Sequence, residues 1–179
     1  MTRAPAPPEG FAEFVAARSD GLLRAAWLLT GDAGRAEDLL QTALARSWLH
    51  WDRIAKDGNP EGYVRRVLYN TYMSWWRRRW RGELPSAAPP DRAGAQDVAV
   101  DSAARDGLRR ALARLTGRQR AVVVLRYVED RTVAETAELL GCSAGTVKTL
   151  AFRALQALRT DPAVRSLLTD EGAEHHDAP

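Results

Sequence analysis

Hydrophobic positions recur every three or four residues along almost the whole chain, and no segment shows the alternation that is typical of strands. The first half predicts three helices, over about residues 10–29, 32–48 and 60–80. Asp32 and Asn59 are suited to cap the second and third helices, and Pro60 is suited to the first helical position. Residues 50–59 predict a loop. The expected fold class is therefore all-α.

The second half predicts four shorter helices, over residues 107–115, 117–129, 132–140 and 143–158. In the first of these helices, Leu108, Leu112 and Leu115 are expected to line the core. Residues 82–106 are rich in Pro, Ala, Gly and Asp and lack a continuous apolar face, which predicts a flexible linker, with its later part a candidate to lead into the next helix. We therefore expect two helical domains, over 10–81 and 107–160, followed by a disordered tail over 161–179.

The third helix carries two apolar stripes instead of one. The stripe expected to face the core holds Val64, Val67, Leu68, Thr71 and Trp75. The opposite side holds Tyr69, Met73, Trp76 and Trp80, flanked by Arg66, Asn70 and Arg77. This second stripe either packs under another helix while its arginines reach water, or forms a platform on which bases stack. The arginines clustered at 77–79 and 81 favour the nucleic-acid interpretation.

Residues 132–155 predict a helix-turn-helix. Thr132 and Glu135 form a capping box, Gly141 permits a left-handed turn, and Ser143 can cap the following helix. That second helix presents Ser143, Ala144, Thr146, Lys148, Thr149, Phe152 and Arg153 along its exposed or leading edge. Such a helix fits the major groove of B-DNA. The alternative is a small helical bundle in which the glycine turn is only structural.

Charge is distributed in blocks that support binding to a polyanion. The net charge is +5 over residues 60–81, −3 over 82–106 and +6 over 107–159. The sequence holds no nucleotide-binding glycine loop, metal-ligand cluster or nucleophile–base pair, so we expect no enzyme activity, cofactor or metal. Cys142 is the one cysteine, and no run of eighteen apolar residues suggests a membrane span. A cytoplasmic protein is expected.

Two segments resemble a known family. LTGRQRAVVVLRYVEDRTVAETAELLGCSAGTVKTLAFRAL resembles the domain of sigma-70-type transcription initiation factors that binds the promoter −35 element. GDAGRAEDLLQTAL and YVRRVLYNTYMSWWRRR resemble the domain that melts the −10 element. Two such domains joined by a short linker are typical of the extracytoplasmic-function (ECF) sigma factors, and the chain is similar to their actinobacterial SigE-like members.

The resemblance implies roles for individual residues. Contact with core RNA polymerase falls on Glu37, Asp38, Leu40 and Gln41, and contact with −10 DNA on Tyr63, Arg66, Asn70, Trp76, Arg77 and Trp80. A base flipped from the −10 element would be captured by residues 50–59, and the −35 element would meet the second helix of the helix-turn-helix. An anti-sigma factor is a further candidate partner, although no residue identifies one.

The chain departs from the family pattern at two places. Ser74 stands where the family usually has an acidic residue, and Thr149-Leu150 stands where it commonly has Ser-Arg. The promoter sequence therefore cannot be carried over from the family.

Two other functions remain open at this point. A stand-alone helix-turn-helix regulator would bind duplex DNA without polymerase and would use residues 10–81 to sense a ligand or to dimerise. A helical adaptor would bind only protein and would show no salt-dependent affinity for DNA.

Overall fold

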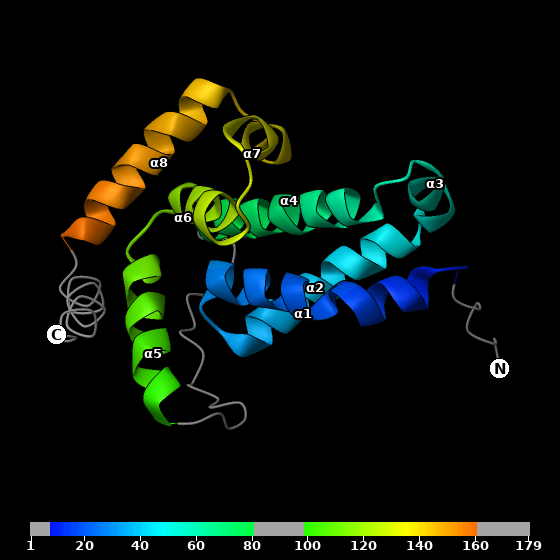
Figure 1. Cartoon of the computed structure of the whole chain (residues 1–179), viewed down its shortest axis with the longest axis horizontal. Helices are drawn as coiled ribbons and strands as arrows, with labels where there is room; N and C mark the ends of the chain where they lie inside the picture. Colours follow the sequence, from blue (N-terminus) through cyan, green and yellow to red (C-terminus); the bar gives the residue numbers. More distant parts are fainter. Residues whose placement is uncertain (1–7, 81–98, 161–179) are drawn as a thin grey trace, which may run out of the picture. The chain divides into compact units, whose positions relative to one another are not determined.

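The computed structural model describes residues 8–80 and 99–160 of the 179-residue chain (Figure 1). These residues form helices and no strand, which confirms the all-α class. The chain divides into two compact units, of which the first carries α1 to α4 and the second α5 to α8. Within the described ranges, no helix is long and apolar enough to cross a membrane.

The first unit is built on a pair of helices that packs against a third. Its helices are α1 (Phe11–Thr30), α2 (Ala33–Trp48), α3 (Trp51–Lys56) and α4 (Pro60–Trp80). α1 and α2 are joined by a tight turn at Gly31, which has a φ of 70°, and α2 also packs along α4. Leu22, Leu29, Leu39 and Leu68 are fully buried between these helices, because each lies on the apolar side of its own helix.

Both predicted caps of the first unit are confirmed. The side chain of Asp32 accepts a hydrogen bond from the backbone N–H of Arg35 at 2.8 Å. The predicted loop over 50–59 is wrong in part, because Trp51–Lys56 is the short helix α3. Trp51 and Ile54, three residues apart, are 2% and 1% exposed. So short a helix has little stability of its own, and contacts with the rest of the unit stabilise it.

The two stripes predicted for α4 are partly confirmed. Val64, Leu68 and Thr71 are buried as expected. Tyr69, which was placed on the outer stripe, is wholly buried, and Trp75, which was placed in the core, is only half-buried. The outward placement of Tyr69 is therefore wrong. The cause is that α4 packs against α1, α2 and α3, so its buried face is wider than one stripe.

The described part of the second unit holds five helical elements. They are α5 (Ala99–Ala113), α6 (Gly117–Val123), the π-helical turn η1 (Val124–Val128), α7 (Val133–Leu140) and α8 (Ala144–Arg159). α5 begins at Ala99, so the helix predicted to start at 107 starts earlier and takes in the last part of the predicted linker 82–106, whose earlier part lies outside the described residues. The predicted tail over 161–179 also lies outside them. Leu112 and Leu115 are buried as predicted, but Leu108 is 38% exposed and does not line the core.

Candidate nucleic-acid interface

One side of α4 forms a stripe in which four of the five residues are polar. Its five members are spaced by three, four, three and four residues, so they lie on one side of the helix over about 21 Å at 1.5 Å per residue. We call this set the α4 stripe; it consists of Tyr63, Arg66, Asn70, Met73 and Arg77. Arg66, Asn70 and Arg77 are exposed, whereas Tyr63 and Met73 are half-buried. The stripe offers cations, an amide and the edge of a ring to a ligand.

The tryptophans at the end of α4 are less exposed than the sequence suggested. Trp75 and Trp76 are both half-buried, and Arg77 and Arg78 beside them are exposed. The side chain of Trp80 lies outside the described residues. Of the two tryptophans predicted on the outer side of α4, Trp76 is the one whose side chain is described, and it is partly accessible.

The helix-turn-helix has the predicted local geometry. The capping box is complete, because Thr132 Oγ1 accepts from the N–H of Glu135 at 3.2 Å and Glu135 Oε2 accepts from the N–H of Thr132 at 2.7 Å. Hydrogen bonds to the Glu135 carboxylate, from the backbone N–H of Thr132 foremost and then from the Thr132 hydroxyl, hold the pKa of this carboxyl below its ordinary value of 4.5. Gly141 has the left-handed φ of 61°, and the N–H of Cys142 bonds back to the carbonyl of Ala137 at 3.0 Å.

The start of α8 is capped and fixed against a small core. Ser143 Oγ accepts a hydrogen bond from the N–H of Thr146 at 3.1 Å. Val122, Ala137 and Val147 are buried together, and Cys142 is a half-buried neighbour of this cluster. The orientation of α8 relative to α7 is therefore set by buried side chains as well as by the turn.

The predicted DNA-facing side of α8 is largely open to solvent. Its exposed members are Ser143, Ala144, Lys148, Thr149, Phe152 and Arg153, and Thr146 is half-buried. Phe152 is 64% exposed, so most of its ring is accessible to a partner. Leu150, at the place where the family resemblance has an arginine, packs against the core cluster of Val122, Ala137 and Val147. It is half-buried, so this position adds packing to the cluster and no positive charge to α8.

The residues of α2 implied in polymerase contact divide into two groups. Glu37, Asp38 and Gln41 are exposed. Leu40 is 6% exposed and supports this surface from the inside instead of forming part of it.

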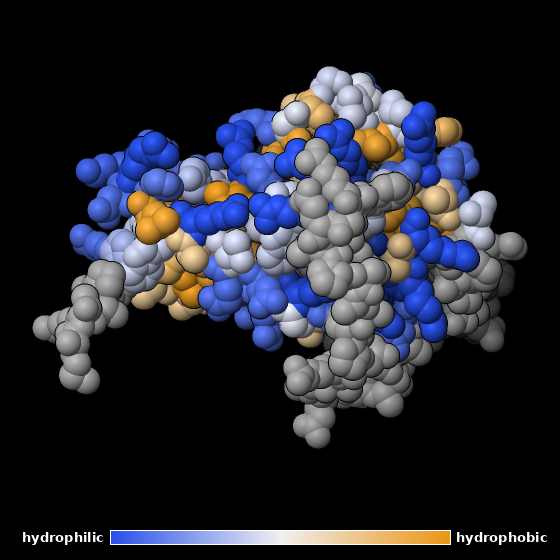
Figure 2. All heavy atoms as spheres, turned by 180° about the vertical axis from the view of Figure 1, so that it is seen from behind, coloured by the Kyte–Doolittle hydropathy of each residue, from blue (hydrophilic) through white to orange (hydrophobic). Residues whose placement is uncertain are grey.

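Exposed apolar side chains are scattered. On the face shown in Figure 2, hydrophobic side chains reach the surface in small areas separated by hydrophilic ones. Within the described ranges, the most exposed of the large ones are Leu49 at 75%, Phe152 at 64% and Tyr127 at 52%. Of these three, Phe152 belongs to the predicted DNA-facing side of α8, whose other exposed members, Ala144 apart, are polar or charged.

Two family descriptions match the chain in the order of its two units. Residues 14–82 match Sigma-70 region 2, and residues 105–158 match Sigma-70, region 4. The chain is 45% identical over 157 residues to the RNA polymerase sigma-E factor of Streptomyces avermitilis, covering 88% of this chain and 87% of the relative. It is 33% identical over 145 residues to the ECF RNA polymerase sigma factor SigL of Mycobacterium tuberculosis, covering 77% and 80%. The chain belongs to the ECF sigma factors of the sigma-70 family.

A solved structure agrees with this assignment. The sigma factor RpoE from Bartonella quintana, crystallised in complex with the anti-sigma factor NepR, matches with a TM-score of 0.64 and 25% identity, covering 85% of this chain and 96% of that one. The matches support a sigma factor that directs promoter-specific transcription initiation. They do not support the stand-alone regulator or the adaptor that binds only protein.

Proposed function

We propose that the two units of this sigma factor divide promoter recognition between the α4 stripe and α8. The exposed Arg66, Asn70 and Arg77 would hold the separated −10 strand, and the accessible part of Trp76 would stack on an unpaired base. Residues 50–59 and Tyr63 would take up a base flipped out of the duplex, a step that costs a few kcal/mol in lost stacking. The observation that carries this proposal is the run of exposed polar residues along one side of α4.

The −35 element is assigned to α8. Ser143, Ala144 and Thr146 lie at its capped start, where the backbone N–H groups of the first turn that the Ser143 cap does not bond suit phosphate oxygens. Thr149 and Phe152 offer a hydroxyl and an apolar surface to base edges, and Lys148 and Arg153 offer positive charge to the backbone.

Core RNA polymerase would dock on the exposed face of α2 formed by Glu37, Asp38 and Gln41. An anti-sigma factor is proposed as a further partner, because the solved relative RpoE is bound to NepR. The protein would act in the cytoplasm by binding alone, without catalysis or a cofactor.

The test is run-off transcription with purified core polymerase, a library of genomic fragments and this protein as the one added factor. We expect discrete transcripts whose yield falls by about tenfold in Arg66→Ala and Asn70→Ala, the loss expected for one base contact. A template already unpaired at −10 should restore much of that yield, because strand separation is then no longer required. Arg24→Ala removes an exposed arginine of α1 away from the stripe and should have no effect. Polymerase that stays silent while the protein alone shifts specific duplexes would overturn the proposal.

A further inference from the structure

We propose that the first half of α1 positions the exposed segment Asp57–Asn59, acting through Trp51 at one end of the segment and Arg18 at the other. This inference rests on the proposed function, which places residues 50–59 against a flipped −10 base. It adds two positioning residues: Trp51, which is 2% exposed and so offers almost no surface to DNA, and Arg18 of α1, which the proposed function does not assign to DNA.

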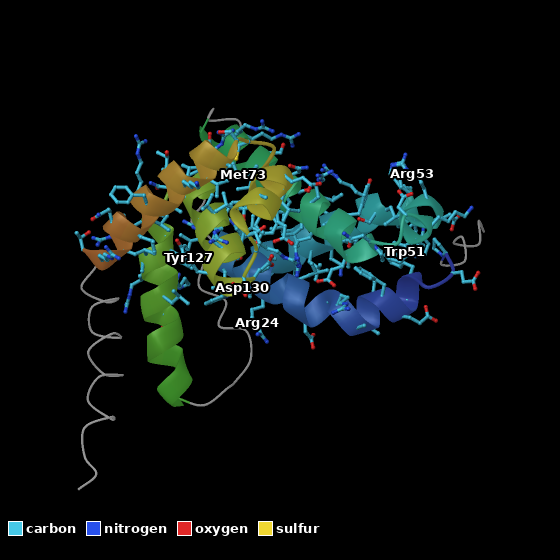
Figure 3. All side chains as sticks on the ribbon, turned by 45° about the horizontal axis from the view of Figure 1, so that its top comes forward. Arg24, Trp51, Arg53, Met73, Tyr127 and Asp130 are labelled. Atoms are coloured by element: carbon cyan, nitrogen blue, oxygen red, sulfur yellow. The ribbon has the colours of Figure 1, made fainter. Side chains whose placement is uncertain are left out.

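The first anchor joins α1 to α3, the short helix before the segment. Trp51 is 2% exposed, and its indole Nε1 donates a hydrogen bond to the backbone carbonyl of Glu9 at 2.9 Å. Its ring meets Phe11 edge-on, with centroids 4.9 Å apart, and lies 5.0 Å from the ring of Phe14. In Figure 3, Trp51 lies between α3 and the start of α1, while Arg53 lies on the outer side of α3. Since α3 has six residues, these contacts fix its position.

The second anchor joins α1 to the first turn of α4, just after the segment. Arg18 Nε lies 3.3 Å from Glu61 Oε2, and Arg65 Nη2 lies 3.1 Å from Glu61 Oε1. The Glu61 carboxylate is therefore held between guanidinium groups from two helices, and the Arg65 residue is itself 9% exposed. This arrangement fixes the start of α4 relative to α1.

The ring contacts of the first anchor and the ion pair of the second come from one face of α1, and the hydrogen bond of Trp51 goes to Glu9, two residues before that helix begins. Phe11, Phe14 and Arg18 are spaced by three and four residues, so their side chains lie one above another along α1. Between the two anchored ends, Asp57, Gly58 and Asn59 are all exposed, and Gly58 turns the chain with a φ of 75°. The segment is therefore exposed to solvent while both of its ends are fixed in position. This arrangement is needed where a ligand must be held to within about 0.5 Å.

Stability and positioning can be separated at Arg18. Its side chain is 57% exposed, and exposed ion pairs contribute little to folding. Arg18→Ala should therefore leave the fold intact while releasing one end of the segment. Trp51→Phe keeps an aromatic ring in the core and removes the N–H that bonds to Glu9. The two variants disturb opposite ends of the same segment by different chemistry.

The experiment uses the full chain assembled with core polymerase on a promoter recovered by the run-off assay. Templates carry each single-base change across the −10 and −35 elements, and initiation rates give the preference for the best base at each position. We expect Arg18→Ala and Trp51→Phe to lower the preference at one −10 position by about fivefold, part of the cost of a wrong base, with −35 preferences unchanged. Arg18→Lys keeps the charge and should restore most of the preference.

Matched controls remove similar groups elsewhere in the same unit. Arg24→Ala removes an exposed arginine of α1, and Trp27→Phe shortens a half-buried tryptophan of that helix; both should keep wild-type preferences. The inference is overturned if Arg18→Ala and Trp51→Phe keep the wild-type −10 preference, or lose −10 and −35 preference equally in step with a lower Tm. A wild-type protein that fails to initiate overturns the proposed function, and this inference with it.

Discussion

The side-chain oxygen Oδ1 of Asn59 accepts a hydrogen bond from the backbone N–H of Gly62 at 2.9 Å, and a Cβ at Gly62 would lie 2.5 Å from the Nδ2 atom of the same side chain. The cap of α4 therefore requires glycine at position 62, because a side chain there would displace the side chain of Asn59. A cap and a glycine that separately look unremarkable are coupled through this contact.

This coupling predicts that Gly62→Ala changes the free energy of unfolding differently in the wild-type chain and in the Asn59→Ala chain. In the wild-type chain, alanine gains about 1 kcal/mol of helix propensity but displaces the cap, which costs a similar amount, so the net change is under about 0.5 kcal/mol. In the Asn59→Ala chain no cap remains to displace, and Gly62→Ala should stabilise by about 1 kcal/mol. Chemical denaturation of the four proteins measures the coupling, and equal effects in both backgrounds would refute it.

Loss of the Arg120 side chain should change stability more than Gly62→Ala does. Its side chain is buried, and its Nε donates to the carbonyl of Leu112 at 2.8 Å, with Nη2 at 3.5 Å from the carbonyl of Leu115. Arg120→Ala leaves these buried carbonyls without that donor, and we expect a loss of about 2–4 kcal/mol in the free energy of unfolding. Arg118→Ala, at an exposed site of the same helix, should cost less than about 0.5 kcal/mol. Similar losses in urea denaturation of the two variants would contradict the assignment.

The features that could be predicted from sequence are those set by neighbours along the chain. The caps at Asp32 and Asn59, the capping box at Thr132 and the left-handed turn at Gly141 each depend on residues within a few positions. All were predicted, and so was the helix-turn-helix they build. Periodicity predicted the outer side of α4, and the family resemblance implied its contact with −10 DNA. The structure adds that Arg66, Asn70 and Arg77 are exposed, whereas Tyr63 and Trp76 are half-buried.

The features that sequence reasoning missed depend on contacts between distant residues. α3 is held by Trp51, whose partner Glu9 is 42 positions away. Tyr69 is buried because α4 has three helical neighbours, a number that periodicity within α4 cannot show. Arg18 and Trp51 were missed as positioning residues for the same reason. The one local signal was the spacing of Phe11, Phe14 and Arg18, which has meaning only once the partners of that face are known.

The capping box of α7 predicts a dependence of stability on pH. The pKa of Glu135 is lowered mainly by the hydrogen bond from the backbone N–H of Thr132, then by the Thr132 hydroxyl, with a smaller contribution from Arg131. A carboxyl whose pKa is lower in the folded state stabilises above the unfolded pKa, and this contribution disappears as the pH falls through the folded value. The Glu135 contribution should therefore be complete at pH 7 and decline below its ordinary pKa of 4.5.

The measurement compares the Tm of wild type and Glu135→Gln between pH 7 and pH 3. Glutamine keeps an oxygen that can accept from Thr132, as Gln119 does from Thr116 at 2.9 Å, but it does not titrate. The difference in Tm between the two proteins should be largest near neutral pH and shrink below pH 4.5. Glu138→Gln controls for the loss of a negative charge from α7. A difference in Tm that stays constant with pH would refute the prediction.

Lys148 and Thr149 are adjacent exposed residues of α8 that are expected to act on DNA in different ways. Lys148 offers a charge to phosphate, so Lys148→Ala should weaken holoenzyme binding to every promoter alike and reduce the slope of log K against log salt by about 0.9. Thr149 offers a hydroxyl and a methyl group to base edges, so Thr149→Ala should change the preferred −35 base and leave that slope unchanged.

Fluorescence anisotropy on promoter duplexes at several salt concentrations, repeated with single-base changes at −35, separates the two roles. The control is Arg159→Ala, which removes a positive charge from the last residue of α8, about 22 Å along the helix from Ala144. Because that end lies far from the capped start, its salt slope should match wild type. If Arg159→Ala lowers the slope as much as Lys148→Ala does, α8 attracts DNA only through its overall charge. If Lys148→Ala changes base preference while the slope stays the same, Lys148 contacts a base edge and its assignment to phosphate is wrong.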